Sequence, residues 1–286
     1  MLRKLTHGIE YLLERDAPGR SLFIYDDDVF IVSYPKSGNT WMRFLIANLL
    51  HSEGPVTFLN IEQIVPDPDL QSRRFLKHCR RPRVMKSHHP FDPRYKRVVC
   101  IVRDPRDVAV SQYYFQIKRG VLQAGHPVED FVRNFVAGTI SAYGSWGQNV
   151  GSWLIARHKT SDFVLLRYED LMRDAVEGLA QVASLLNIPA GRSRLEKAVQ
   201  FSSADCMRSM EKEQAGQWAS TKETRKDLPF VRAAQCGEWK VTLSPNAAAQ
   251  IEQAWGGLMR VLGYLSEPAP ADASRTIFEM VGIASR

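Results

Sequence analysis

The residues best suited to chemistry lie in one short loop, residues 34–41, which reads YPKSGNTW. An apolar run precedes this loop and a helical pattern follows it, so the loop joins a strand to a helix. Free N–H groups at a helix start attract an anion, and Lys36, Ser37 and Thr40 add a positive charge and two hydroxyls. Lys36 precedes the only glycine, Gly38, whereas a Walker A lysine follows the second glycine. The pattern favours a phosphate or sulfate site over an ordinary surface turn.

Arg103 and Ser111 indicate a second anion site. Arg103 ends another apolar run, at the carboxyl edge where α/β sheets bind ligands, and Ser111 lies two turns into the following helix. A guanidinium fork beside a hydroxyl suits a second phosphate group. The alternative is a structural ion pair between Arg103 and Asp104, Asp107 or another carboxylate.

A candidate general base follows a shorter apolar segment, where residues 86–90 read KSHHP. An imidazole with a near-neutral pKa beside Lys86, at the end of a strand, suits His88 to proton abstraction. Paired histidines are also common as plain surface or core residues. Zinc binding is a further alternative, but adjacent side chains point apart and a third ligand is not evident, so we expect no metal site.

A parallel sheet would bring these residues together at one edge. Short apolar, β-branched runs predict strands at residues 29–34, 84–86, 97–102 and 163–166. Helical spacing and helix-start signals predict helices at residues 40–51, from 105 through 114, and at 170–186. Strands that alternate with helices define an α/β fold with a central parallel sheet flanked by helices.

The chain reads as one domain. We expect a single domain over residues 1–286, with its core at about 29–265. Glycines and prolines predict irregular loops at residues 120–125 and 211–237. The Ala-, Pro- and Ser-rich tail, residues 268–286, is a candidate mobile segment.

Composition narrows the class of partner. The formal net charge is +7, which suits an anionic partner such as a nucleotide, a nucleic acid or a membrane surface, although solubility alone explains it equally well. The basic residues are spread out, and we expect no nucleic-acid partner. No stretch approaches the ~20 apolar residues of a membrane span, and the N-terminus has no signal-peptide core, which predicts a cytoplasmic protein. The four cysteines form no CxxC pair, so neither a disulfide framework nor a zinc site is indicated.

Taken together, these segments resemble the cytosolic sulfotransferase family, whose donor is 3′-phosphoadenosine 5′-phosphosulfate (PAPS). Residues 34–41 are similar to the family loop YPKSGTTW, and residues 103–114 (RDPRDVAVSQYY) to RNPKDVAVSYYH. Four further segments match in the expected order: KSH at 86–88, YGSWGQNVGSW at 143–153, LLRYED at 165–170 and FVRAAQCGEWK at 230–240. Any one match is unspecific, whereas the ordered set is highly specific.

The resemblance implies a P-loop NTPase-like sulfotransferase fold, with PAPS as donor and 3′-phosphoadenosine 5′-phosphate (PAP) as product. The 5′-phosphosulfate would be held by Lys36, Ser37, Gly38, Asn39 and Thr40. The 3′-phosphate would be held by Arg103, Ser111 and Arg232, and the adenine by Trp41, with Tyr168 and Ser202 completing the site. His88 would be the general base, with Lys36 and Lys86 stabilising charge during in-line transfer to a hydroxyl or amine of a small-molecule acceptor.

Departures from the family pattern qualify this expectation, among them Asn39 for the first Thr of the loop and Ser202-Ser203-Ala204 for the family's TSF segment at the adenine. Ala233-Ala234 replaces the Lys-Gly of the family's 3′-phosphate segment, and Asn149 stands where the family usually has His. The family's dimer motif is disrupted by Ser244-Pro245, which leaves the oligomeric state undetermined. A P-loop kinase and a nucleotide-binding protein without catalysis remain alternatives.

The acceptor itself is not specified by the sequence. We expect its pocket to come from residues 57–81, 121–147 and 211–232. Candidate lining residues are aromatic, with core packing as the alternative, favoured for the first two: Phe131, Phe135, Tyr143 and Trp146. Aromatic walls suit a small lipophilic or phenolic acceptor.

Overall fold

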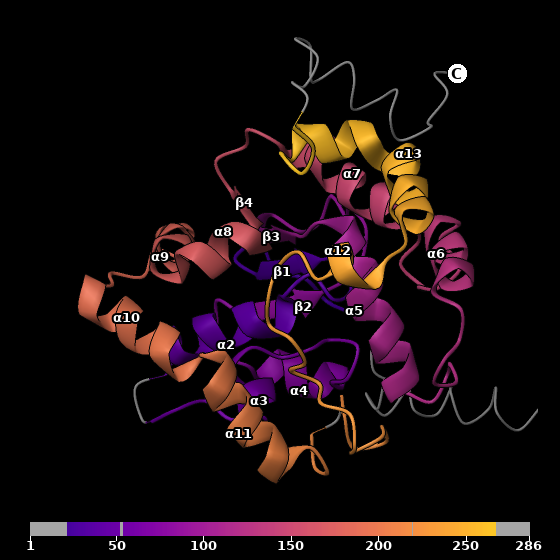
Figure 1. Cartoon of the computed structure of the whole chain (residues 1–286). Coiled ribbons are helices and arrows are strands. Elements are labelled where there is room, and N and C mark those ends of the chain that lie inside the picture. The colour runs from indigo at the N-terminus through magenta and orange to yellow at the C-terminus, as the bar shows by residue number, and fades with distance from the viewer. Residues whose placement is uncertain (1–21, 52–53, 219, 267–286) are drawn as a thin grey trace, which may run out of the picture.

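A computed structural model describes residues 22–51, 54–218 and 220–266 (Figure 1). Its centre is a four-stranded, entirely parallel sheet with the strand order β2-β1-β3-β4. The strands are β1 Val29–Ser33, β2 Val84–Ser87, β3 Arg97–Val102 and β4 Phe163–Arg167. All four predicted strands are therefore confirmed, and the β1–α2 connection is the candidate anion loop.

Helices cover both faces of this sheet (Figure 1). The longer ones are α2 Asn39–Leu50, α5 Pro105–Lys118, α6 Val128–Val136, α7 Trp146–Arg157, α9 Ala175–Leu185, α10 Arg192–Phe201, α11 Ala204–Gln214 and α13 Pro245–Val261. The shorter ones are α3 Ile61–Ile64, α4 Arg73–His78, α8 Tyr168–Arg173 and α12 Trp239–Thr242. The α/β class with flanking helices is confirmed.

Alternation along β1 divides the core into two layers. Phe30 and Val32 point to one face and pack with side chains of α5, α6, α7 and α13. Val29 and Ile31 point to the other face and pack with α2, α9 and α10. All four of these side chains are fully buried, as expected for a parallel sheet covered on both sides. The sheet is thus fixed from both faces, which holds the strand ends rigidly in place.

Two element predictions are wrong. The helix expected at residues 170–186 is two helices, α8 and α9, because Asp174 has a non-helical backbone (φ −145°, ψ 87°) and its side chain caps α9 by accepting the Glu177 N–H. The irregular loop expected from residue 211 begins only after Gln214. Residues 211–214 are the last turn of α11, whose start is capped by the Ser203 side chain. The segment 120–125 is irregular, as predicted.

Three of the four aromatic residues considered for the acceptor pocket belong to the core. Phe131, Phe135 and Trp146 are each 1% exposed or less and pack in the layer that contains α13. Trp146 contacts the Trp255 ring, at 5.4 Å between centroids, so its predicted pocket role is wrong. The core alternative is confirmed for Phe131 and Phe135.

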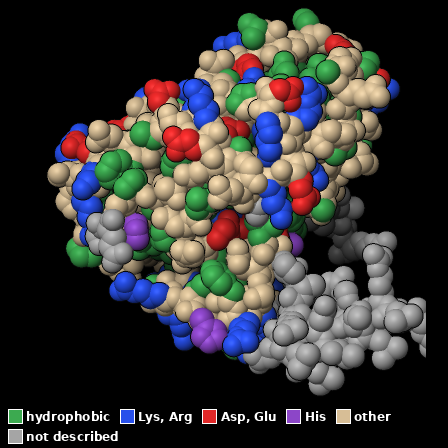
Figure 2. All heavy atoms as spheres, turned by 90° about the horizontal axis from the view of Figure 1, so that it is seen from below, with side chains coloured by type: hydrophobic (Ala, Val, Ile, Leu, Met, Phe, Trp, Pro, Cys, Tyr) green, Lys and Arg blue, Asp and Glu red, His purple; other side chains and the backbone are tan. Residues whose placement is uncertain are grey.

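The surface and helix lengths bear on the composition-based predictions. Basic and acidic side chains are interspersed over the face shown in Figure 2. Within residues 22–266, gaps excepted, no helix is both long enough and apolar enough to cross a membrane. The candidate mobile tail, residues 268–286, lies outside the described residues.

Candidate nucleotide-binding and active site

A cavity of about 480 Å³ lies at the carboxyl ends of β1, β2 and β3. Parallel α/β sheets bind their ligands at this edge. Most of the predicted site residues line it, namely Lys36, Gly38, Asn39, Thr40, Trp41, Lys86, His88, Arg103, Ser111, Tyr168 and Arg232. Residues far apart in the sequence therefore meet in one cavity, as the motifs predict.

The anion loop has the backbone shape that its glycine predicts. Gly38 has φ +101°, and a Cβ built there would lie 2.7 Å from Cδ2 of Tyr168. The Tyr168 ring also supports the Arg103 guanidinium at 4.4 Å. Glycine is thus required at position 38 for both conformation and space. Tyr168 ties the anion loop to the Arg103 strand end.

Two buried polar side-chain atoms lie in this loop or next to it. Ser37 Oγ and Arg103 Nε are inaccessible to solvent and have no hydrogen-bond partner among the described residues. Ser37 itself does not line the cavity in this arrangement. Buried donors without partners are costly unless a ligand satisfies them. Their presence beside the α2 start fits a phosphate or sulfate group there.

Lys36 lies between two aromatic rings. Its ammonium is 4.2 Å from the Phe115 centroid and 4.4 Å from the Phe230 centroid. Burial, and then the charge of Arg103, lowers its pKa to about 7. A lysine in this state gains its full charge when an anion approaches, which suits a ligand-binding role.

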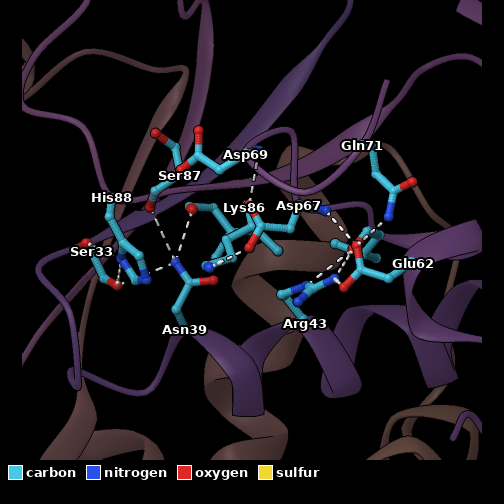
Figure 3. A network of polar contacts seen from close by, with 12 residues as sticks. Ser33, Asn39, Arg43, Glu62, Asp67, Asp69, Gln71, Lys86, Ser87 and His88 are labelled. Atoms are coloured by element: carbon cyan, nitrogen blue, oxygen red, sulfur yellow. Dashed lines mark hydrogen bonds and ion pairs between the residues drawn. The ribbon is translucent and has the colours of Figure 1, made fainter. Parts of the chain in front are cut away.

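Asn39 faces the sheet and not a ligand. Its Nδ2 donates to the Ile31 carbonyl at 3.0 Å, to Ser33 Oγ at 3.2 Å and to the Ser87 carbonyl at 3.3 Å (Figure 3). The side chain therefore joins the ends of β1 and β2. Of the groups of Asn39, only the backbone N–H at the start of α2 can therefore make the predicted contact with the cofactor.

Ser202 supports the adenine side of the cavity from behind. It is fully buried and does not line the cavity. Its hydroxyl donates to the Ala198 carbonyl and accepts from Asn48, while its carbonyl accepts the Trp41 Nε1–H at 3.0 Å. The hydroxyl and carbonyl of Ser202 are thus bonded within the protein, and the structure does not bring this predicted nucleotide-binding residue to the cavity. Ser202 instead fixes the Trp41 indole.

His88 is held in one tautomer. Its Nδ1 lies 2.7 Å from the Ser33 carbonyl oxygen (Figure 3). A carbonyl only accepts, so Nδ1 carries the proton and the lone pair of the neutral ring is at Nε2. Burial, and then the charge of Lys86, lowers the His88 pKa below its ordinary value. Asn149, which stands where the family usually has His, donates from Nδ2 to the His88 carbonyl at 2.9 Å. Its side chain therefore holds the backbone of His88 in place.

An acidic network behind Lys86 was not predicted from the sequence. The Lys86 ammonium is ion-paired with Asp67, which is 3% exposed (Figure 3). The Asp67 N–H in turn donates to Glu62, which pairs with buried Arg43 at 2.7 Å. No residue of 57–81 lines the cavity described above, contrary to the acceptor-pocket prediction. Asp67 in this segment instead holds Lys86 from behind. No motif marks these carboxylates, and only the tertiary contact with β2 identifies them.

The structural alternative for Arg103 is not observed. Asp104 pairs with Arg106 at 2.6 Å, and Asp107 accepts backbone N–H groups of Gly237 and Trp239. Arg103 itself donates to two carbonyls, those of Lys36 at 3.3 Å and Gln235 at 2.9 Å. Its charge is thus not neutralised by the neighbouring carboxylates that the sequence offered. This arrangement favours an anion ligand.

A parallel α/β sheet with an anion loop, a second cationic group and a tautomer-fixed histidine is typical of a nucleotide-dependent group-transfer enzyme. The family model described as "Sulfotransferase domain" matches residues 26–263. The chain therefore belongs to the sulfotransferase family, and the predicted family and enzyme class are confirmed. Members of this family take the sulfuryl group from PAPS.

Curated relatives agree with this assignment. Human sulfotransferase 2B1 is 28% identical over 257 residues, which cover 83% of this chain and 67% of that protein. The 3-beta-hydroxysteroid sulfotransferase of Cavia porcellus is 27% identical over 228 residues, covering 76% of this chain and 78% of that protein.

Solved structures share the fold. Mouse sulfotransferase SULT7A1 complexed with PAP has a TM-score of 0.67 at 23% identity, covering 91% of this chain and 90% of that one. Retinol dehydratase in complex with retinol and PAP has a TM-score of 0.68 at 19% identity, covering 85% and 84%. The sulfotransferase fold, which is P-loop-like, is thus confirmed.

Proposed function

We propose that this chain transfers the sulfuryl group of PAPS to a hydroxyl or amine of a small-molecule acceptor, by in-line displacement with His88 as general base. The observation that carries the proposal is the geometry of His88, because its Nδ1–H is committed to the Ser33 carbonyl and its Nε2 is left as the acceptor. We further propose that the chain is one sulfotransferase domain and that it acts in the cytoplasm. The family match over residues 26–263 supports the domain.

The residues of this site would perform three tasks in the transfer. The α2 start, Ser37 and Lys36 would hold the phosphosulfate, and Arg103 with Ser111 would hold the 3′-phosphate. PAPS, when bound, supplies the transferable sulfuryl group. Lys36 and Lys86 would neutralise charge that develops on the transferred and leaving oxygens, which is the main catalytic task in such transfers.

His88 has the protonation state that a base requires. With its pKa lowered by burial and by Lys86, the ring is neutral at pH 7 and able to take the acceptor proton at Nε2. Asp67 holds the Lys86 ammonium next to this ring. The proton would thus move to a group with a fixed orientation and a free lone pair.

The acceptor is proposed to be small and lipophilic or phenolic. Phe115, Ile140, Tyr143 and Phe230 line the cavity with apolar surface, which is typical of pockets for such molecules. Ile140 and Phe230 fall within the segments predicted for this pocket, and of the four aromatic candidates Tyr143 alone lines the cavity. Its hydroxyl donates to Asp69 at 2.9 Å, so the ring is fixed in place.

A matched pair of variants tests the general base. In His88→Asn the side-chain amide can still donate to the Ser33 carbonyl, but the group corresponding to Nε2 is lost. We expect the transfer rate to fall by roughly 10²–10⁴-fold while PAP affinity stays within about twofold. The control is His158→Asn, since His158 is exposed at the end of α7 and does not line the cavity. Near-wild-type turnover of His88→Asn would sink the proposed role of His88.

A further inference from the structure

The Arg232 guanidinium already has an anionic partner within the chain. Its two terminal nitrogens donate to the two carboxylate oxygens of Glu238, and its Cζ lies 4.4 Å from the centre of the Tyr114 ring. The Glu238 side chain is 12% exposed and lines the same cavity. A guanidinium binds phosphate with the same two-pronged geometry. Glu238 therefore occupies the fork that a phosphate group would use.

The backbone on either side of this pair is fixed. Asp107, in the first turn of α5, accepts the Gly237 N–H at 2.7 Å and the Trp239 N–H at 3.0 Å. At the other end, Arg208 Nη2 donates to the carbonyls of Arg232 at 3.2 Å and Ala233 at 3.1 Å. Exchange of the carboxylate for a phosphate thus requires a new Glu238 rotamer and no movement of the loop.

Glu238 lowers the positive charge at the fork itself. Arg103 and Arg232 carry two positive charges, and Glu238 cancels one of them at direct contact. Ala233 and Ala234 add no cation. A phosphate that binds Arg232 must displace the Glu238 carboxylate. The displaced carboxylate then lacks its guanidinium partner. Each of these effects reduces the free energy gained from the phosphate.

We propose that Glu238 is a specificity-determining residue that weakens selection for the 3′-phosphate of the nucleotide. This inference rests on the proposed PAPS site and deepens it. The site distinguishes an adenosine 3′,5′-bisphosphate from an adenosine 5′-monophosphate less strongly than its two arginines alone would. Removal of the Glu238 charge releases the Arg232 fork for the phosphate and restores this discrimination.

Calorimetric titration of the full chain with PAP and with adenosine 5′-monophosphate tests the inference. Glu238→Gln keeps the side-chain length and removes the charge. It is expected to bind PAP about tenfold more tightly than the wild type, a change equivalent to one good charge interaction, while 5′-monophosphate affinity stays within about twofold. Glu238→Ser, which withdraws the side chain from Arg232, is expected to give the same result and serves if the Gln variant does not fold.

The matched control is Glu252→Gln. Glu252 pairs with Arg106 at 2.6 Å and does not line the cavity, so this variant makes the same change in net charge elsewhere. It is expected to alter neither affinity. Unchanged or weaker PAP binding by both Glu238 variants, or equal tightening for both nucleotides, would overturn the inference alone. Failure of the wild type to bind either nucleotide would instead contradict the proposed function itself.

Discussion

Neighbouring groups determine the protonation state of His88 at this site. Burial and the nearby Lys86 ammonium both disfavour the charged ring, and they lower the His88 pKa below its ordinary value of 6.5. The imidazole is therefore neutral over the physiological range. The Ser33 carbonyl decides which nitrogen keeps the proton. A base of this kind loses function only when the pH falls far enough to protonate it.

The acid limb of the pH–rate profile is expected below pH 6.5. Activity requires neutral His88, so the contribution of His88 to kcat/KM should be constant above the lowered pKa and fall as the pH drops through it. The ratio of wild-type to His88→Asn kcat/KM cancels the nucleotide's own ionisation and isolates this limb. A limb in that ratio centred above pH 6.5 would mean that His88 is not held neutral by its surroundings.

Lys36 makes nucleotide affinity depend on pH in the opposite direction. Its pKa of about 7 means that the free chain carries this charge below pH 7 and loses it above. Phosphosulfate binding favours the charged form, so binding above pH 7 takes up a proton. PAP affinity is expected to fall as the pH rises from 7, by up to about tenfold per unit.

Calorimetry at pH 8 in two buffers of different ionisation enthalpy measures that uptake. Above pH 7 the nucleotide phosphates are already ionised, with a second pKa of about 6, so they do not contribute the proton. Lys36→Arg, which cannot deprotonate, is the control and should abolish the buffer dependence. Identical heats for the wild type in both buffers would contradict the shifted Lys36 pKa.

Residue identity alone predicted most of the site but not the direction of each side chain. Lys36, Arg103 and His88 lie where the motifs place them, because strand ends of a parallel sheet meet at one edge. Asn39 turns back to the sheet and Ser202 is buried behind Trp41. Which hydrogen bonds a polar side chain makes depends on neighbours distant in sequence, and a linear motif does not contain them.

At the scale of the element, the β1–α2 connection depends on glycine at position 38. We expect Gly38→Ala to destabilise the chain by more than the roughly 1–2 kcal/mol of left-handed strain, because the added Cβ would also meet Tyr168 at 2.7 Å. The displaced Tyr168 would disturb Arg103, so PAP binding should weaken too. Urea unfolding and PAP titration measure the two effects.

Gly120→Ala separates strain from contact. Gly120 has φ +70°, but a Cβ there meets nothing within 4 Å, so this variant carries only the conformational cost. It should lower the free energy of unfolding by about 1–2 kcal/mol and leave PAP affinity unchanged. Equal losses in the free energy of unfolding of the two variants would show that contact with Tyr168 adds nothing to the cost of Gly38→Ala.

Local pattern predicted strands better than helix ends. The runs at 29–34 and 97–102 are apolar because both sheet faces are covered, and that signal is unambiguous. The predicted helix at 170–186 is interrupted where the sequence has neither proline nor glycine. The interruption comes from Asp174, whose side chain caps the next helix. Asp in a helical pattern is compatible with either outcome, and packing decides between them.

At the scale of the whole molecule, nucleotide binding should stabilise the fold. The cavity is built from the ends of three strands and from α2, α5 and the segment before α12, so a ligand there joins elements from both halves of the chain. PAP at 100 times its Kd is expected to stabilise the folded state by about 2.7 kcal/mol and to raise Tm by several degrees. Adenosine, which lacks the phosphates, is the control, and an equal Tm shift with adenosine would contradict the proposed anion sites.

The most direct measurement follows a radiolabelled sulfuryl group. The intact chain is incubated with labelled PAPS and a panel of phenols, alcohols, sterols, amines and glycans, and label and PAP are counted together. We expect label to appear on at least one small acceptor with one PAP formed per label transferred, and His88→Asn to lose roughly 10²–10⁴-fold of this rate. Tight PAP binding by the wild type with no transfer to any acceptor in the panel would contradict the proposed function.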